Sequence, residues 1–195
     1  MNPELLLLIG ISFSLGFAPG PNNAVASYSA FNFGIRKTIP VILGVGFGYT
    51  TLVILLIYVL ISVFEKYPYL TEIIRILGSI FLLYLAYKIS FSKKDAKSKN
   101  QNPVKFYETF FFQFINPKGV MAAITLISKF VNQENYINSS IAVIIVCAIT
   151  AFSSITTWAF LGKFLRKFAT NNEFIRRFNY AMSILLVGCV IGFYL

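Results

Sequence analysis

The chain has 195 residues, of which 57% are hydrophobic and 12% are charged, and its mean hydropathy is +0.73. A soluble domain carries about 25% charged residues, so this composition excludes an ordinary soluble fold and favours a protein that lies in a lipid bilayer. The formal net charge is +10. The basic residues are spread over short loops, which argues against a nucleic-acid partner because membrane topology already accounts for such a spread.

Six apolar runs follow one another along the chain and predict six transmembrane helices. Each run reaches the ~20 residues that a helix needs to cross ~30 Å of hydrocarbon. The runs are too long for strands of a membrane barrel, which have about 9–11 residues. We therefore expect an all-α membrane protein. The runs cover residues 3–31, 38–64, 70–91, 106–131, 138–161 and 174–195.

The distribution of basic residues predicts the orientation of these spans. Three loops on one side of a six-span chain hold 13 of the 17 basic residues. The positive-inside rule assigns such loops to the cytoplasm, so both termini are expected outside. The loops contain Arg36 and Lys37, six lysines from Lys88 to Lys105, and five basic residues from Lys163 to Arg177.

A polar and basic segment at residues 92–105 divides the chain into two halves of three spans each, residues 1–91 and 106–195. We expect this segment to be a cytoplasmic linker within one integral membrane domain. Since three is an odd number, the second half enters the membrane in the opposite sense to the first. That arrangement predicts two inverted three-helix repeats.

The first and fourth spans each contain a helix-breaking cluster. Residues 17–23 read Phe-Ala-Pro-Gly-Pro-Asn-Asn, and residues 114–119 read Phe-Ile-Asn-Pro-Lys-Gly. Proline removes a backbone donor and glycine loosens the chain. Non-helical backbone at membrane depth is tolerated only beside protein or a watery cavity. One cluster alone would indicate a simple proline kink, whereas two clusters at corresponding places indicate the binding site of a transporter.

Small and polar residues in other spans allow two interpretations each. Gly44 and Gly48 form a GxxxG step, which lets helices approach closely. We expect it to serve packing within the bundle, and a homodimer face is the alternative. Hydroxyl side chains in the fifth span either line a pathway or bond back to their own helix. They are Ser153, Ser154, Thr156 and Thr157.

Several chemistries lack the residues that they need. The chain has no histidine, its seven acidic residues form no cluster, and it has no P-loop, no GxGxxG motif and no Ser-His-Asp set. Neither a metal site, a cofactor nor an enzyme activity is therefore indicated. Cys147 and Cys189 are single cysteines in different spans, which disfavours a thiol carrier.

Four local features together resemble the LysE/RhtB family of bacterial amino-acid exporters over essentially the whole chain. They are Pro19-Gly20-Pro21, the basic turn at 34–37 before glycine-rich residues 44–48, Gly78 with the aromatic-leucine stretch to Lys88, and Asn116-Pro117-Lys118. The resemblance implies a secondary transporter that exports amino acids or related small polar metabolites across the bacterial inner membrane, with proton or ion coupling. The alternatives are a passive channel or structural membrane subunit and, less favoured, a membrane-embedded lipid enzyme.

The two breaks supply the expected site for such a substrate. A break exposes the N-terminus of the next half-helix, which attracts anions, and a lysine in mid-span costs about 2.5–3.5 kcal/mol to insert. We expect Lys118 and these amides to hold a carboxylate, with carbonyls near Pro19 and Asn116 accepting from an ammonium. Alternatively, Lys118 pairs with carbonyls and pins the break. The predicted substrate-binding residues are Pro19, Gly20, Pro21, Asn22, Asn23, Asn116, Pro117 and Lys118.

The sequence contains no obvious side chain within a span that could carry a proton. All seven acidic residues are predicted near span ends or in loops, and there is no histidine. Membrane proton relays normally use Asp, Glu or His. Glu4 or Glu108 can serve only if a cavity reaches them, so no single coupling group is predicted.

Overall fold

The structure is a computed structural model that describes residues 3–60, 66–90, 104–169 and 171–194. All regular structure in these ranges is helical, so the predicted all-α class is confirmed. The first half contains α1 (Pro3–Phe17), α2 (Pro21–Phe33), α3 (Ile35–Leu55), a π-helical turn (Leu56–Leu60) and α5 (Tyr69–Ser90). The second half contains α6 (Phe106–Ile115), α7 (Pro117–Phe130), a 3-10 turn (Gln133–Asn135), α8 (Tyr136–Arg166) and α9 (Asn172–Gly192).

Within the described ranges, 4 segments are long and apolar enough to cross a membrane by themselves. The pairs α1–α2 and α6–α7 pass the same test when each is taken as one span, and they are bent by 57° and 60°. The number of candidate spans is 6 if both pairs are counted. The helix α8 has 31 residues and is about 46 Å long, so it must tilt or extend beyond the ~30 Å hydrocarbon layer.

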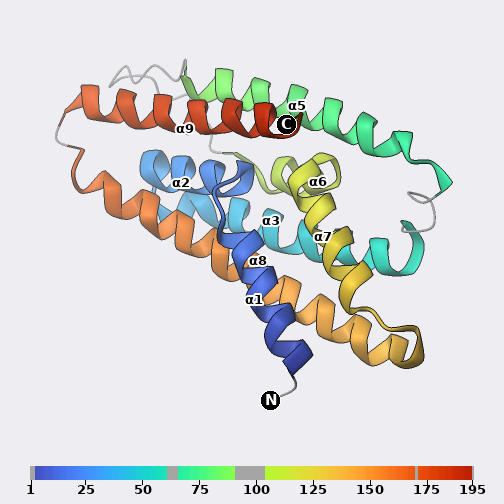
Figure 1. The fold of residues 1–195 in the computed structure, drawn as a ribbon. Coiled ribbons are helices and arrows are strands. Elements are labelled where there is room, and N and C mark those ends of the chain that lie inside the picture. Colours follow the sequence, from blue (N-terminus) through green and yellow to red (C-terminus); the bar gives the residue numbers. More distant parts are fainter. Residues whose placement is uncertain (1–2, 61–65, 91–103, 170, 195) are drawn as a thin grey trace.

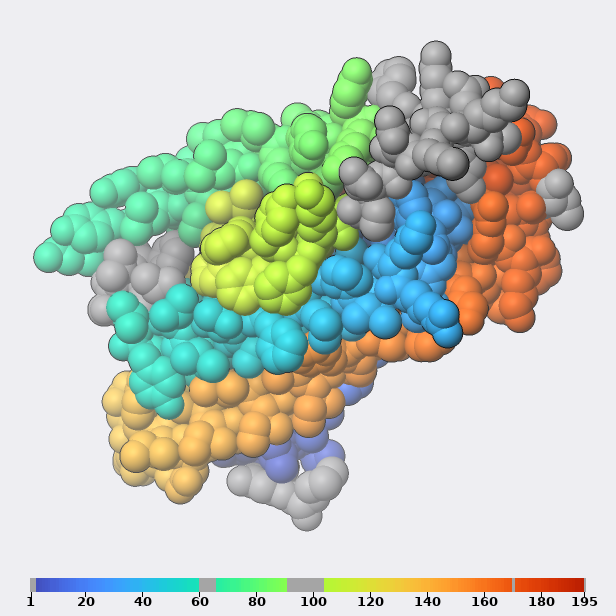
Figure 2. All heavy atoms as spheres, turned by 180° about the vertical axis from the view of Figure 1, so that it is seen from behind, coloured from blue at the N-terminus to red at the C-terminus, as the bar shows by residue number. Residues whose placement is uncertain are grey.

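Helices from the two halves interleave. The helix α2 packs against α8 and α9, α3 packs against both α6 and α8, and α5 pairs with α9. Figure 1 shows α5 and α9 side by side along one face of the molecule. In the view from behind, α6 lies between α5 and α3 (Figure 2). Because α1 also contacts α7 and α8, the first helix break lies among elements of the second half.

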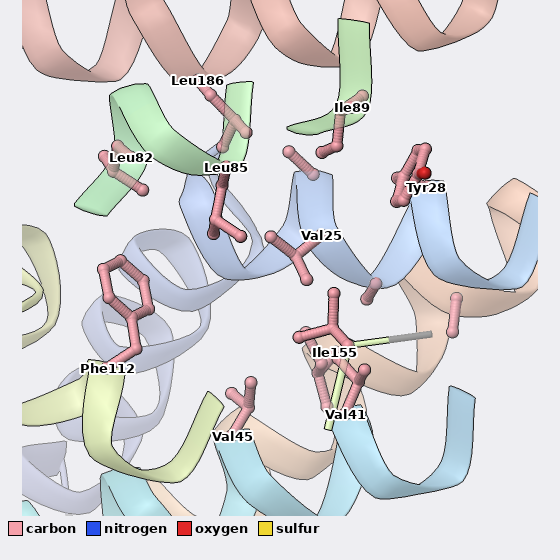
Figure 3. Packing of buried hydrophobic residues seen from close by; sticks show 14 of the residues in the cluster. Val25, Tyr28, Val41, Val45, Leu82, Leu85, Ile89, Phe112, Ile155 and Leu186 are labelled. Carbon is pink, nitrogen blue, oxygen red and sulfur yellow. The ribbon is translucent and has the colours of Figure 1, made fainter. Parts of the chain in front are cut away.

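A buried apolar cluster joins six helices of the two halves, α2, α3, α5, α6, α8 and α9. Val25 of α2, Val45 of α3 and Ile155 of α8 meet below Leu85 of α5, and Phe112 of α6 lies beside them (Figure 3). These five side chains are at most 3% exposed. Since lipid tails are as apolar as the side chains, close packing holds such a cluster together in a membrane rather than the hydrophobic effect.

The predicted packing glycines, Gly44 and Gly48, face α6. A methyl group added to Gly48 would lie 2.7 Å from the carbonyl oxygen of Phe110 and 2.9 Å from Cγ of Gln113. A methyl group added to Gly44 would collide with Thr109. Both glycines are buried within the chain, where they allow α3 and α6 to approach closely. A homodimer stays a prediction.

Turns that carry basic residues lie at one end of the molecule, which we call the basic end. The α2–α3 turn, beside Arg36 and Lys37, and the α8–α9 connection both lie at the left of Figure 1, whereas the α7–α8 connection lies at the right. The α2–α3 turn is tight because Gly34 has a φ of +81°, a conformation that suits glycine. The predicted linker at 92–105 lies outside the described residues except for Val104 and Lys105.

Candidate functional site

The first helix break leaves backbone carbonyls that an asparagine satisfies. The helix α1 ends at Phe17 and α2 begins at Pro21, so the last carbonyls of α1 lack the helical donors that would follow. The side chain of Asn23 donates to the carbonyl oxygens of Gly16 at 3.1 Å and Ala18 at 3.0 Å. Asn23 is buried, and it holds the two helices at their bend.

Side chains of α8 satisfy further carbonyls at the same break. Ser154 donates to the carbonyl oxygen of Gly16 at 2.8 Å, and the indole of Trp158 donates to that of Phe17 at 3.3 Å. Of the hydroxyl side chains singled out in the fifth span, Ser154 therefore faces the break. Two of its neighbours bond back to their own helix, namely Ser153 and Thr157.

Lys118 reaches from α7 to the first break. Its Nζ donates to the carbonyl oxygens of Ala18 at 2.8 Å and Pro19 at 3.1 Å. These carbonyls follow the C-terminus of α1, where a helix dipole favours a cation. The two breaks are thus joined by charge-assisted hydrogen bonds, an arrangement in which Lys118 pins the bend of the first helix pair.

The second break leaves a polar atom without a partner. The helix α6 ends at Ile115, α7 begins at Pro117, and Asn116 between them has extended backbone and is 2% exposed. Its side-chain oxygen Oδ1 is buried and has no hydrogen-bond partner in the described part of the chain. Burying such a group costs about 1–3 kcal/mol. A buried group of this kind needs a partner such as an ordered water or a ligand.

A pair of amides connects the two halves beside the breaks. Asn22 of α2 and Gln113 of α6 each donate to the other, at 2.9 and 3.1 Å. Gln113 is fully buried and also donates to the carbonyl oxygen of Thr109 at 2.8 Å. Gln113 was not among the predicted site residues, although a glutamine within the apolar run Phe106–Ile115 is a signal of function in a membrane span.

A partly enclosed cavity of about 80 Å³, which we name the enclosed cavity, lies between the breaks. Its wall is polar on the side of α1 and α8, where Ser12 donates to Thr150 at 3.0 Å. Lys118 is the only charged side chain among the residues that line it. Six of the eight predicted site residues line this cavity, namely Gly20, Pro21, Asn22, Asn23, Asn116 and Lys118. Ser12, Tyr49, Thr150 and Ser154 also line it and were not among those predicted.

A second cavity of about 490 Å³ also has Lys118 in its wall. It extends toward the start of α5, where Arg75 lines it, and toward the end of α9, where Phe193 lines it. The other two predicted site residues, Pro19 and Pro117, line this larger cavity. Lys118 lines both cavities, together with Leu15 and Ala122. Lys118 therefore belongs to the walls of both the enclosed cavity and the larger cavity.

Four helices and two bent helix pairs are long and apolar enough to cross a membrane, which is the architecture of a multi-pass membrane protein with two discontinuous helices. The chain belongs to the LysE type translocator family, whose model matches residues 13–195. The predicted family is thereby confirmed. Membership of this family, together with the apolar helices, makes the chain a multi-pass protein of the inner membrane.

Curated relatives cover most of the chain. It is 31% identical over 175 residues to the cysteine/O-acetylserine efflux protein of Salmonella typhimurium, which is 89% of this chain and 88% of that protein. It is 26% identical over 174 residues to the cysteine/O-acetylserine efflux protein of Escherichia coli K12, with the same shares of the two chains. No solved structure matches the chain.

Proposed function

We propose that this protein is a secondary transporter that exports small amino acids and related polar metabolites, and that the enclosed cavity between the two helix breaks binds the substrate. The observation that carries the proposal is that Asn116, whose Oδ1 has no partner among the described residues, and the cationic Lys118 both line that cavity. A buried acceptor and a cation suit the ammonium and the carboxylate of an amino acid.

The size of the cavity and the names of the relatives support a small substrate. A volume of 80 Å³ corresponds to on the order of five water positions at 10–15 Å³ each. Cysteine and O-acetylserine, which the relatives' names give as exported compounds, are short zwitterions. We propose L-cysteine and O-acetyl-L-serine as the first substrates to test.

The predicted site residues have distinct roles in this proposal. Asn116 accepts from the substrate, Lys118 supplies the cation, and Asn22 and Asn23 hold the wall through their hydrogen bonds to Gln113 and to α1. The prolines and Gly20 keep the backbone free of helix at the site. They are Pro19, Pro21 and Pro117.

We further propose that the chain is an inverted repeat whose basic end faces the cytoplasm. Corresponding helices of the two halves pair with each other, α3 with α8 and α5 with α9, as a pseudo-twofold axis would require. The two bent pairs differ by only 3° in their bend, at 57° and 60°. The clustering of basic turns at one end supports cytoplasmic loops there and both termini outside (Figure 1).

The experiment is transport by the purified protein in liposomes loaded with L-cysteine on one side. An exporter coupled to a proton or ion gradient accumulates the substrate against its concentration gradient, whereas a passive channel only equilibrates it. A structural subunit or a lipid enzyme moves no amino acid at all. Lack of transport for a panel of amino acids would refute the proposed function.

Two substitutions test the site itself. Lys118→Met and Asn116→Ala are expected to lower transport at least about tenfold, because each removes a hydrogen bond to a charged group of the substrate. Asn138→Ala is the matched control, since Asn138 is exposed and bonds to Asn135 far from the cavity. If both site variants transport at the wild-type rate, the assignment of the cavity as the substrate site is refuted, whereas the proposed export function is not.

A further inference from the structure

The ammonium of Lys118 lies where backbone oxygens would suit the ammonium of an amino acid. Its Nζ is 2.8 Å from the carbonyl oxygen of Ala18 and 3.1 Å from that of Pro19. Pro19 and Pro21 have no N–H, and Gly20 between them is extended, so the break supplies acceptors with few competing donors. The same two oxygens cannot hold Lys118 and a substrate ammonium at full strength together.

We propose that the substrate takes the place of Lys118 at these two carbonyls, so that Lys118 is an internal competitor that sets which molecules are carried. This inference rests on the proposed function. The ammonium of the amino acid binds the carbonyls of Ala18 and Pro19 and the unpartnered Oδ1 of Asn116. The released ammonium of Lys118 then binds the substrate's carboxylate. Each charge exchanges one partner for another, and none is left unpaired in the cavity.

The exchange makes the site specific for zwitterions. A molecule without an ammonium cannot displace Lys118, and a molecule without a carboxylate offers the released lysine no partner. Among the described residues, Lys118 is the one charged side chain in the wall of the enclosed cavity, so the released cation is the lysine itself. The substrate class is therefore a small molecule that carries both an ammonium and a carboxylate, as an α-amino acid carries both on its Cα, and the cavity of about 80 Å³ favours a small one.

The exchange also connects binding to opening. Lys118 lines both the enclosed cavity and the larger cavity of about 490 Å³. While it is bonded to Ala18 and Pro19, its side chain lies between the two spaces. When the substrate displaces it, the boundary loses the contact that joins α7 to the end of α1. The substrate itself thus releases the route toward the end of the molecule opposite the basic end.

Gly20 offers a way to displace the lysine without removing its charge. A methyl group added there would lie 2.8 Å from Nζ and 3.1 Å from Cδ of Lys118. Because these atoms belong to the free end of a long side chain, the lysine moves, and the extended backbone at Gly20, with a φ of −171°, also suits alanine. Gly119→Ala is the matched control, since its methyl group would be 3.4 Å from Asn116, an ordinary contact.

Competition against L-cysteine transport by the wild-type protein tests the specificity. The competitors are 3-mercaptopropionate, which lacks the ammonium, and cysteamine, which lacks the carboxylate. Each is expected to compete at least about tenfold more weakly than unlabelled L-cysteine. Tenfold corresponds to the smallest loss of binding free energy expected when one charge-assisted hydrogen bond is removed. If cysteine is transported but 3-mercaptopropionate competes equally well, the exchange is refuted and the proposed function stands. If no amino acid is transported, both proposals fall.

Thiol labelling tests the boundary. In a chain with Cys147→Ala and Cys189→Ala, an Ala151→Cys substitution places a thiol in the wall of the enclosed cavity. A membrane-impermeant methanethiosulfonate reagent, added at the end opposite the basic end, should label it slowly. Adding Gly20→Ala or Lys118→Met should speed labelling at least about tenfold, and adding Gly119→Ala should not. If the Ala151→Cys protein and its three derivatives are all labelled at the same rate, the role of Lys118 at the boundary is refuted.

Discussion

The amide pair of the half-buried Asn22 and the fully buried Gln113 is expected to hold the two halves together at the breaks. Each amide donates to the other, at 2.9 and 3.1 Å. Side-chain hydrogen bonds between membrane helices contribute about 0.6 kcal/mol on average and up to about 1.7 kcal/mol. Two such bonds predict a coupling energy of about 1–3 kcal/mol between the residues. Asn22→Leu also leaves the side-chain oxygen of the fully buried Gln113 without its partner, which adds to the cost of that single substitution.

The measurement is a double-mutant cycle with Asn22→Leu and Gln113→Leu. Unfolding of the purified protein by sodium dodecyl sulfate in mixed micelles can be followed through the fluorescence of Trp158, the single tryptophan of the chain. This residue donates to the carbonyl oxygen of Phe17 at the first break, so its signal reports on the region of interest. The free energy of unfolding is compared for the four proteins of the cycle.

An exposed amide pair provides the control. Asn138 donates to Asn135 at 2.8 Å on the surface, where water replaces a lost bond, so the same cycle there should give a coupling energy near zero. A coupling energy below about 0.3 kcal/mol for Asn22 and Gln113, or one no larger than that of the control pair, would refute the reasoning.

Three further substitutions or modifications follow from packing and exposure. Gly48→Ala should lower the free energy of unfolding by about 1–3 kcal/mol because its methyl group would meet the backbone of Phe110. Gly10 has open space around it, so Gly10→Ala should leave the free energy of unfolding unchanged or raise it by up to about 1 kcal/mol. Equal effects of the two substitutions in a micelle unfolding assay would count against close contact of α3 and α6. Ser154→Ala should slow L-cysteine transport because Ser154 bonds to Gly16 in the cavity wall, while Ser153→Ala should not, and identical transport rates would contradict this. A maleimide reagent should label Cys189, which lines the larger cavity, before it labels Cys147, which is fully buried. If mass spectrometry shows the reverse order, the larger cavity does not give access to Cys189.

Composition and apolar run length were sufficient to predict a helical membrane protein, because the bilayer demands long helices and tolerates few charges. Boundaries were less accurate. The run predicted at 138–161 belongs to α8, which extends over Tyr136–Arg166, since Lys163 and Arg166 interrupt the apolar pattern without ending the helix. The π-helical turn at Leu56–Leu60 has no proline or glycine to reveal it.

The candidate site could be predicted only where residue type carries the signal. Proline and glycine mark the places where α1 and α6 end, because these residues interrupt helices in any context. The partner of Lys118 was left open between a carboxylate and backbone carbonyls, since a sequence does not give the distance between spans. Tyr49, Thr150 and Gln113 were missed because their place in the wall depends on helix rotation, which tertiary packing decides.

The position of a bound amino acid tests the central claim most directly. Crystals of the protein grown with L-selenocysteine under reducing conditions would give an anomalous signal from selenium. The account predicts a selenium peak in the enclosed cavity, with density for the amino acid within hydrogen-bond distance of Oδ1 of Asn116 and of Nζ of Lys118. A peak only in the larger cavity or on the lipid-facing surface would contradict it.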